Sequence, residues 1–142
     1  MRSEWGLTLN NWCEILAGQI RYLSHGVAVY SNLDPSREWA GAPMIELSTR
    51  EISQQNFLSG DYQTTHALSA LMRCESESVA SATVDELVTI IDKSLEALRS
   101  RGQIAGFTLE QSGVTPDARG VVSGESFYGY VDFTLTEKIR TL

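Results

Sequence analysis

The first periodic pattern along the chain is that of an amphipathic helix near its start. Apolar residues recur at helical spacing from Leu9 to Leu23, while most intervening positions are polar. Thr8 stands where its hydroxyl can cap the first turn, and Gly26 follows the last turn, as is typical of a helix end. We therefore predict a helix whose buried stripe consists of Leu9, Trp12, Cys13, Leu16, Ile20 and Leu23.

A second stretch, from Val84 to Leu98, repeats the same spacing. Thr83 and Glu86 have the separation of a capping box, in which each side chain accepts a hydrogen bond from a backbone N–H of the first turn. Gly102 follows the basic last turn and can adopt the left-handed conformation that ends a helix. The predicted stripe is Val84, Leu87, Val88, Ile91, Leu95 and Leu98.

The remaining apolar patterns are short or alternate with a period of two, which indicates strands. The clearest lies near the end of the chain, where Val131, Phe133 and Leu135 alternate with polar residues and tyrosines. The predicted strands are Val27–Tyr30, Met44–Ile52, Tyr62–Cys74, Ile104–Leu109 and Phe127–Ile139.

The order of these elements predicts the fold class. Ser53 to Gly60 is a polar segment between two predicted strands, which we expect to form a long antiparallel hairpin. Grouped strands with two helices favour an α+β fold, a mostly antiparallel sheet of about five strands with both helices packed on one face. Gly113 to Ser126 is rich in turn residues and is predicted to be a mobile loop. No shift in composition divides the chain, so residues 1–142 are expected to form a single domain.

Charge and composition exclude several classes of protein. The 142 residues include 18 acidic and 11 basic side chains, a formal net charge of −7. Nucleic-acid binding requires basic patches, and the scattered arginines with only Lys93 and Lys138 do not provide one. No apolar run approaches the roughly 20 residues of a membrane span, and the first residues do not resemble a secretory signal. We expect a protein that is made and kept reduced inside the cell.

No motif for catalysis or metal binding stands out. His25 follows a predicted helix, His66 lies within a strand among threonines, and no nucleophile-elbow pattern surrounds any serine. Cys13 and Cys74 fall on apolar faces, where a role in the core is expected. The acidic pairs Glu75 with Glu77 and Asp34 with Glu38 are interpreted as a solvated acidic edge, and the glycines form no phosphate-binding fingerprint. We therefore expect no enzymatic activity, no cofactor and no metal ion.

Several aromatic and apolar residues stand where contact with water is expected. They are found in the connection from Asp34 to Pro43, at the tip of the predicted hairpin and on the outward face of the last strand. Aromatic residues are enriched in protein interfaces. The alternative is that Trp39 closes over the core and that the tyrosines are ordinary strand residues. The candidate interface residues are Arg37, Trp39, Phe57, Leu58, Tyr128 and Tyr130.

The layout resembles the tail terminator, or tail completion, proteins of tailed bacteriophages, the family of the lambda tail terminator. Element order, chain length and acidic balance carry this resemblance over nearly the full length, and no individual binding residue is transferred with it. The matching elements are the helix Leu9 to Leu23, the run Val27-Ala28-Val29-Tyr30, the proline-led Ala42-Pro43-Met44-Ile45-Glu46-Leu47, the long hairpin, the helix Val84 to Leu98 and the closing Tyr130-Val131-Asp132-Phe133-Thr134-Leu135-Thr136.

The resemblance implies a structural virion protein that forms a homo-hexameric ring. Such a ring caps the tail tube, ends its polymerisation and offers a joining surface to head–tail connector or neck proteins. DNA would pass through the bore without specific binding, because acidic charge on the wall discourages adhesion. The protein would then reside in the tail or neck of the virion, and in the host cytoplasm during assembly, with no membrane partner.

Two other functions remain open at this point. The chain could be a neighbouring neck or head–tail connector component, which shares ring formation and size with the tail terminators. From a different class, it could be a small α+β ligand-binding domain or enzyme that uses His66 with Asp61 or Glu75.

Overall fold

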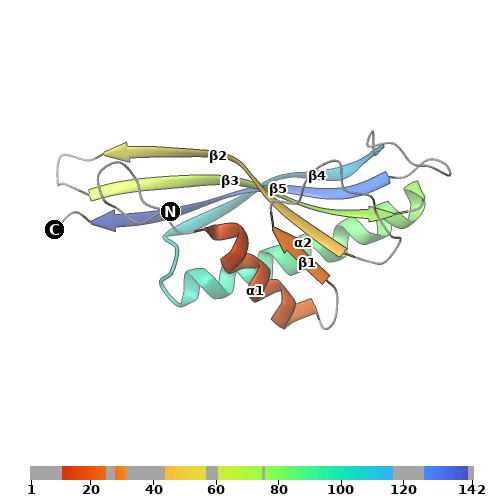
Figure 1. Ribbon diagram of the computed structural model, residues 1–142, viewed down its shortest axis with the longest axis horizontal. Helices are drawn as coiled ribbons and strands as arrows, with labels where there is room; N and C mark the ends of the chain where they lie inside the picture. Colours follow the sequence, from red (N-terminus) through yellow and green to blue (C-terminus); the bar gives the residue numbers. More distant parts are fainter. Residues whose placement is uncertain are drawn as a thin grey trace.

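The computed structural model describes residues 11–24, 28–31, 44–56, 61–74, 76–116 and 127–140. Within these ranges the chain forms two helices and one five-stranded sheet (Figure 1). Their order along the chain is the predicted one. The elements are α1 (Trp12–Ser24), β1 (Ala28–Ser31), β2 (Met44–Asn56), β3 (Asp61–Cys74), α2 (Glu77–Ser100), β4 (Gly106–Pro116) and β5 (Phe127–Arg140).

The sheet is mostly antiparallel, with the strand order β1-β2-β3-β5-β4. The hairpin of β2 and β3 is antiparallel, as predicted, and so are the pairs β3–β5 and β5–β4, whereas β1 lies parallel to β2. Both helices cover the same face: α1 packs on β1 and β2, and α2 packs on β3, β4 and β5 (Figure 1). The α+β fold class is therefore confirmed.

The core lies between the helices and this one face of the sheet. In β5 the alternation is the predicted one, since Val131, Phe133 and Leu135 are at most 1% exposed while Tyr128 and Asp132 lie on the other face. Burying a side chain of this size stabilises the fold by about 1.5–3 kcal/mol. The helix residues of the core are Trp12, Cys13, Leu16, Ala17 and Ile20 in α1 and Leu87, Ile91, Leu95 and Leu98 in α2.

Two strands are longer than the alternation predicted. β2 continues to Asn56 rather than Ile52, and β4 runs from Gly106 to Pro116 rather than from 104 to 109. Both extensions consist mostly of polar residues, and their backbone groups pair with a central strand, β3 or β5. The prediction of loops at 53–60 and 113–126 is therefore wrong for residues 53–56 and 113–116, and the other loop residues lie outside the described ranges.

The first helix begins at Trp12, and its first turn is held by Asn11. The Asn11 side-chain oxygen accepts a hydrogen bond from the backbone N–H of Glu14, at 3.3 Å. This contact satisfies one of the N–H groups that the first turn leaves without a helical partner. Thr8, the predicted cap, and Gly26, the predicted stop, lie outside the described residues.

The predicted start of the second helix is wrong by about two turns. α2 begins at Glu77, and Ser76 is its N-cap, with the Ser76 hydroxyl accepting from the backbone N–H of Val79. Thr83 lies inside the helix and donates its hydroxyl hydrogen to the Val79 carbonyl at 2.8 Å, so it does not form a capping box with Glu86. Small and polar residues precede the apolar stripe, and helical periodicity alone does not reveal that they are helical.

The end of α2 agrees with the prediction. Gly102 has a φ of 74°, the left-handed conformation that favours glycine, and its N–H donates to the Arg99 carbonyl. One turn earlier, Arg99 hydrogen-bonds to Glu96, which lowers the pKa of the Glu96 carboxyl and raises that of Arg99. A cation in the last turn also interacts favourably with the helix dipole.

Mutation can distinguish a second helix capped by Ser76 from one capped by Thr83. We expect Ser76→Ala to lower the free energy of unfolding by about 1 kcal/mol, because a cap hydrogen bond is lost. Thr83→Ala should change it by less than about 0.5 kcal/mol, because the helix continues on both sides of Thr83 and alanine favours helix. Urea denaturation followed by circular dichroism measures both values. A larger loss in Thr83→Ala would contradict the observed helix start.

The close approach of α2 to β5 provides a second test. A Cβ added at Gly129 would lie 2.7 Å from Cγ2 of Val84 and 3.2 Å from the Ala80 carbonyl oxygen. Gly129→Ala should therefore lower the free energy of unfolding by about 1–3 kcal/mol. The matched control is Gly106→Ala, where a Cβ meets nothing within 4 Å. Equal midpoints of urea denaturation for the two variants would show that the helix is not held this closely.

Candidate functional site

Two β-bulges mark the face of the sheet that the helices do not cover. Arg50 is the extra residue of the bulge in β2, and Glu110 is the extra residue of the bulge in β4. The first bulge lies beside Leu68 in β3 and the second beside Phe133 in β5, and these two residues pair with each other. The bulges in β2 and β4 are therefore at the same level of the sheet. A bulge disrupts the local ladder and redirects side chains.

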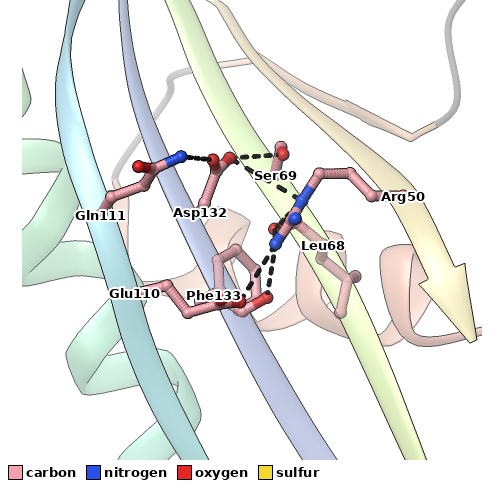
Figure 2. Close-up of polar contacts among 7 residues, drawn as sticks. All are labelled: Arg50, Leu68, Ser69, Glu110, Gln111, Asp132 and Phe133. Carbon is pink, nitrogen blue, oxygen red and sulfur yellow. Dashed lines mark hydrogen bonds and ion pairs between the residues drawn. The ribbon is translucent and has the colours of Figure 1, made fainter. Parts of the chain in front are cut away.

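The side chain of Arg50 spans the two central strands at this level (Figure 2). Its Nε and Nη2 atoms both donate to the Leu68 carbonyl oxygen at 3.2 Å, and Nη2 also lies 3.5 Å from the Phe133 carbonyl oxygen. From the other side, Glu110 reaches the same Nη2 atom with its Oε1 at 3.2 Å. This ion pair links β2 and β4 across β3 and β5. Hydrogen bonds from a guanidinium are stronger than those from neutral donors.

Asp132 on β5 is held next to Arg50 by neutral donors. The Ser69 hydroxyl donates to Oδ1 at 2.6 Å, and the Gln111 amide donates to Oδ2 at 2.7 Å (Figure 2). The Nε atom of Arg50 lies 3.8 Å from Oδ1, and the Asp132 side chain is 15% exposed. A carboxylate with partners on three other strands is held in one orientation, and Asp132 still meets solvent.

Tyr128 and Tyr130 complete the site. They lie two residues apart on β5, and their rings meet edge to face with centroids 6.3 Å apart and planes at 69°. Gly113 in β4 is opposite Tyr130, and a Cβ there would be 3.3 Å from the tyrosine oxygen. The absence of a side chain at Gly113 therefore gives the Tyr130 ring room to lie over β4. Such a pair offers apolar area with hydroxyl groups at its rim.

Together these side chains line an open depression of about 440 Å³ on the uncovered face. Most of its lining residues carry a hydrogen-bonding group, and donors and acceptors are mixed. None of these lining residues is a histidine or a cysteine. The depression offers hydrogen-bonding groups, two compensated charges and aromatic area, with the Asp132 carboxylate beside the Ser69 hydroxyl. The lining residues are Ser48, Arg50, Ser69, Leu71, Gln111, Thr115, Tyr128, Tyr130 and Asp132.

The structure places two of the six candidate interface residues. Tyr128 and Tyr130 lie side by side in the depression, both half-buried, on the uncovered face as predicted. Arg37, Trp39 and the pair Phe57 and Leu58 lie outside the described residues, so their place in an interface remains a prediction.

His66 lies on the opposite, helix-covered face. It is 2% exposed, and its Nε2 atom is 3.1 Å from Oε1 of Glu137, whose side chain is 6% exposed. The Trp12 ring meets the His66 ring edge to face at 6.3 Å. Residue 75 and the side chain of residue 61, the carboxylates considered with His66 above, lie outside the description. Among the described residues, no group of three or more His, Cys, Asp or Glu could hold a metal ion.

Both cysteines occupy the core positions that the pattern predicted. Cys13 is fully buried, with its sulfur 3.2 Å from the Thr49 hydroxyl, and Cys74 is 5% exposed and lies 3.8 Å from the Thr83 hydroxyl. Neither thiol is accessible in the way that a nucleophile requires.

Most of the site was missed by the sequence analysis. Arg50, Ser69, Glu110, Gln111 and Asp132 come from four different strands, and their convergence depends on two bulges at matching levels. The only signal in the chain is that Asp132 interrupts an outward-facing row that otherwise consists of Tyr and Thr. That signal is too weak to identify its partners.

Comparison with known proteins adds no family. No protein-family model matches the chain, and no curated protein matches it significantly. In the described part of the chain, neither helix is long and apolar enough to cross a membrane.

The site geometry predicts unequal roles for its two carboxylates. Asp132→Asn should lower the free energy of unfolding by about 1–2 kcal/mol. The Asp132 carboxylate accepts two hydrogen bonds and forms an ion pair with Arg50, and a neutral amide with one acceptor oxygen cannot replace all three interactions. Glu110→Gln should cost less than about 1 kcal/mol, because the Glu110 side chain is 44% exposed and water screens its ion pair. Chemical denaturation of both variants measures the difference, and a larger effect of Glu110→Gln would contradict it.

Proposed function

We propose that this chain is a structural protein of a tailed bacteriophage that forms a homo-hexameric ring and caps the tail tube as a tail terminator. The observation that carries the proposal is the one-sided sheet. Its helix-covered face forms the core, and its other face presents an aromatic and polar depression held by the Arg50 and Asp132 contacts. A wide sheet face of this kind fits a protein interface better than an enclosed chemical pocket.

Ring formation requires two different surfaces on each copy. A closed ring is built from head-to-tail contacts, in which one patch meets a different patch on the next subunit. The helix side and the open sheet side are such different surfaces, and they are the two outer sides of the packed helix and sheet layers. Tyr128 and Tyr130 are the proposed anchors on the open side, because tyrosines contribute strongly at interfaces while keeping their hydroxyl groups hydrated.

The acidic balance supports the proposed passage of DNA. The exposed side of α2 carries the acidic residues Glu77, Asp85, Glu86 and Asp92 and the basic residues Lys93 and Arg99. A surface of this charge repels a phosphate backbone and does not retain it. The order of elements along the chain, on which the resemblance to tail terminators rests, is the order found in the fold.

The ring is tested by measuring assembly of the purified chain, alone and with a tail-tube subunit from the same phage. Native mass spectrometry and electron microscopy are expected to show hexameric rings that bind tube ends. In a variant carrying Tyr128→Ser and Tyr130→Ser, we expect at least about tenfold weaker assembly, since anchor residues typically contribute more than 1.4 kcal/mol each. Thr134→Ala, on the same face of β5 but outside the depression, is the matched control.

Three outcomes would count against parts of this proposal. A monomer that ignores tube subunits under all conditions contradicts the tail-terminator function. Rings that bind head-side connector proteins but not the tube identify a neck component instead. Rings that form equally well in the double tyrosine variant, with folding confirmed by circular dichroism, show that the depression is not the contact surface.

A further inference from the structure

Among the described strands, only β1 pairs with the outer edge of β2, and it does so over part of its length. β1 pairs with β2 only from Met44 to Leu47, and beyond that point no strand in the described part of the chain lies against this edge. The unpaired stretch runs from Ser48 to Asn56. Alternate backbone N–H and C=O groups along such an edge point away from the sheet and are available to another strand.

The middle of this stretch is also uncovered on both faces. Residues 51 to 55 are all exposed, although neighbouring residues of a strand point to opposite faces. Ile52, in the middle of the stretch, is 46% exposed, and it is one of two large apolar residues with high exposure among the described residues. An apolar side chain on an open edge loses contact with water favourably when another strand covers it.

The usual protection of edge strands is weak here. Proteins shield free edges with proline, lysine, bulges or a covering helix. At the opposite edge of the sheet, β4 ends in Pro116 and α2 packs against it. Beyond its bulge at Arg50, β2 contains neither proline nor lysine and continues as a regular strand to Asn56.

We propose that this edge pairs with the same edge of a second copy of the chain, through a two-fold axis perpendicular to the sheet at Ile52. Two copies of β2 then run antiparallel, and the two sheets join into one continuous sheet. This is a form of strand addition in which the backbone provides the affinity and the side chains provide the register. A two-fold contact uses the same patch on both copies.

The register is set by the residues around Ile52. With the axis at this position, Ile52 of each copy faces Ile52 of the other, so the exposed apolar side chains cover each other. Glu51 then lies opposite Ser53, and the bulge at Arg50 faces Gln54 and ends the regular pairing. Each side chain remains on its own face of the sheet, and no two like charges are directly opposed.

This two-fold contact is independent of the proposed ring. A two-fold contact closes after two copies and cannot by itself supply the head-to-tail contact of a hexamer. It pairs free subunits before assembly, or two rings through their edges. Its interface is small, so we expect a dimer that depends on protein concentration.

Sedimentation velocity over a concentration series tests the contact. The chain is expected to dimerise, and Ile52→Lys should weaken the dimer at least about tenfold, because two lysines would face each other in place of the apolar pair. Val79→Lys is the matched control, since Val79 is 53% exposed and lies in the first turn of α2, away from this edge. Circular dichroism of both variants reports on folding.

A cross-link tests the register directly. Opposed residues of antiparallel strands lie within the Cα separation that a disulfide bridges, so Ile52→Cys is expected to give a covalent dimer on mild oxidation. Val79→Cys should not. Cys13 and Cys74 are buried and do not compete for the cross-link.

Four results would overturn the two-fold contact. They are a monomer at every concentration, a dimer that Ile52→Lys leaves unchanged, no cross-link in Ile52→Cys, and loss of hexameric rings in Ile52→Lys. The last result would place the β2 edge in a head-to-tail contact. Intact rings together with loss of the dimer in Ile52→Lys support the two-fold contact, and an absent dimer with intact rings leaves the proposed function standing.

Discussion

Burial of one face of the sheet against two helices is the constraint on which the rest of this structure depends. The apolar stripes of α1 and α2 and the inward row of β5 cover one another, and Gly129 allows α2 to approach β5 closely. In the described part of the chain, these two helical stripes are the only ones that cover the sheet. The other face consequently keeps polar and tyrosine side chains, and the edges keep unpaired backbone groups.

The two bulges change which side chains of the long strands β2 and β4 point to the helices. An extra residue shifts the alternation by one position, so that Leu47 and then Ile52 point to the helix side in β2, and Leu109 and then Val114 do so in β4. Because the bulges lie at the same level, the positions that point to the helices shift by one residue in β2 and in β4 at that level. The polar contacts of the open face gather at this level, where Arg50 supplies donors to carbonyl groups of the central strands.

The proposed ring and the proposed two-fold contact use different consequences of the same one-sided burial. The ring uses the open face, where aromatic area and oriented polar groups are presented by a rigid sheet. The two-fold contact uses the β2 edge, which extends beyond β1 and is covered on neither face between residues 51 and 55. A chain that leaves a face and an edge available can make two kinds of contact without one competing with the other. Subunits that remain soluble before they assemble commonly need separate surfaces for separate contacts.

The sequence by itself determined the order and type of the elements, the α+β class and the inward rows of α1, α2 and β5, because long uninterrupted periodicity identifies which side of an element is buried. It placed Tyr128 and Tyr130 together on the outward face for the same reason. Only the tertiary structure decided the strand ends, the start of α2 at Ser76 and the contacts of Arg50 with Glu110. Strand pairing stabilises polar segments that have no apolar rhythm of their own, and a bulge interrupts that rhythm at a position where the chain carries no local mark of it.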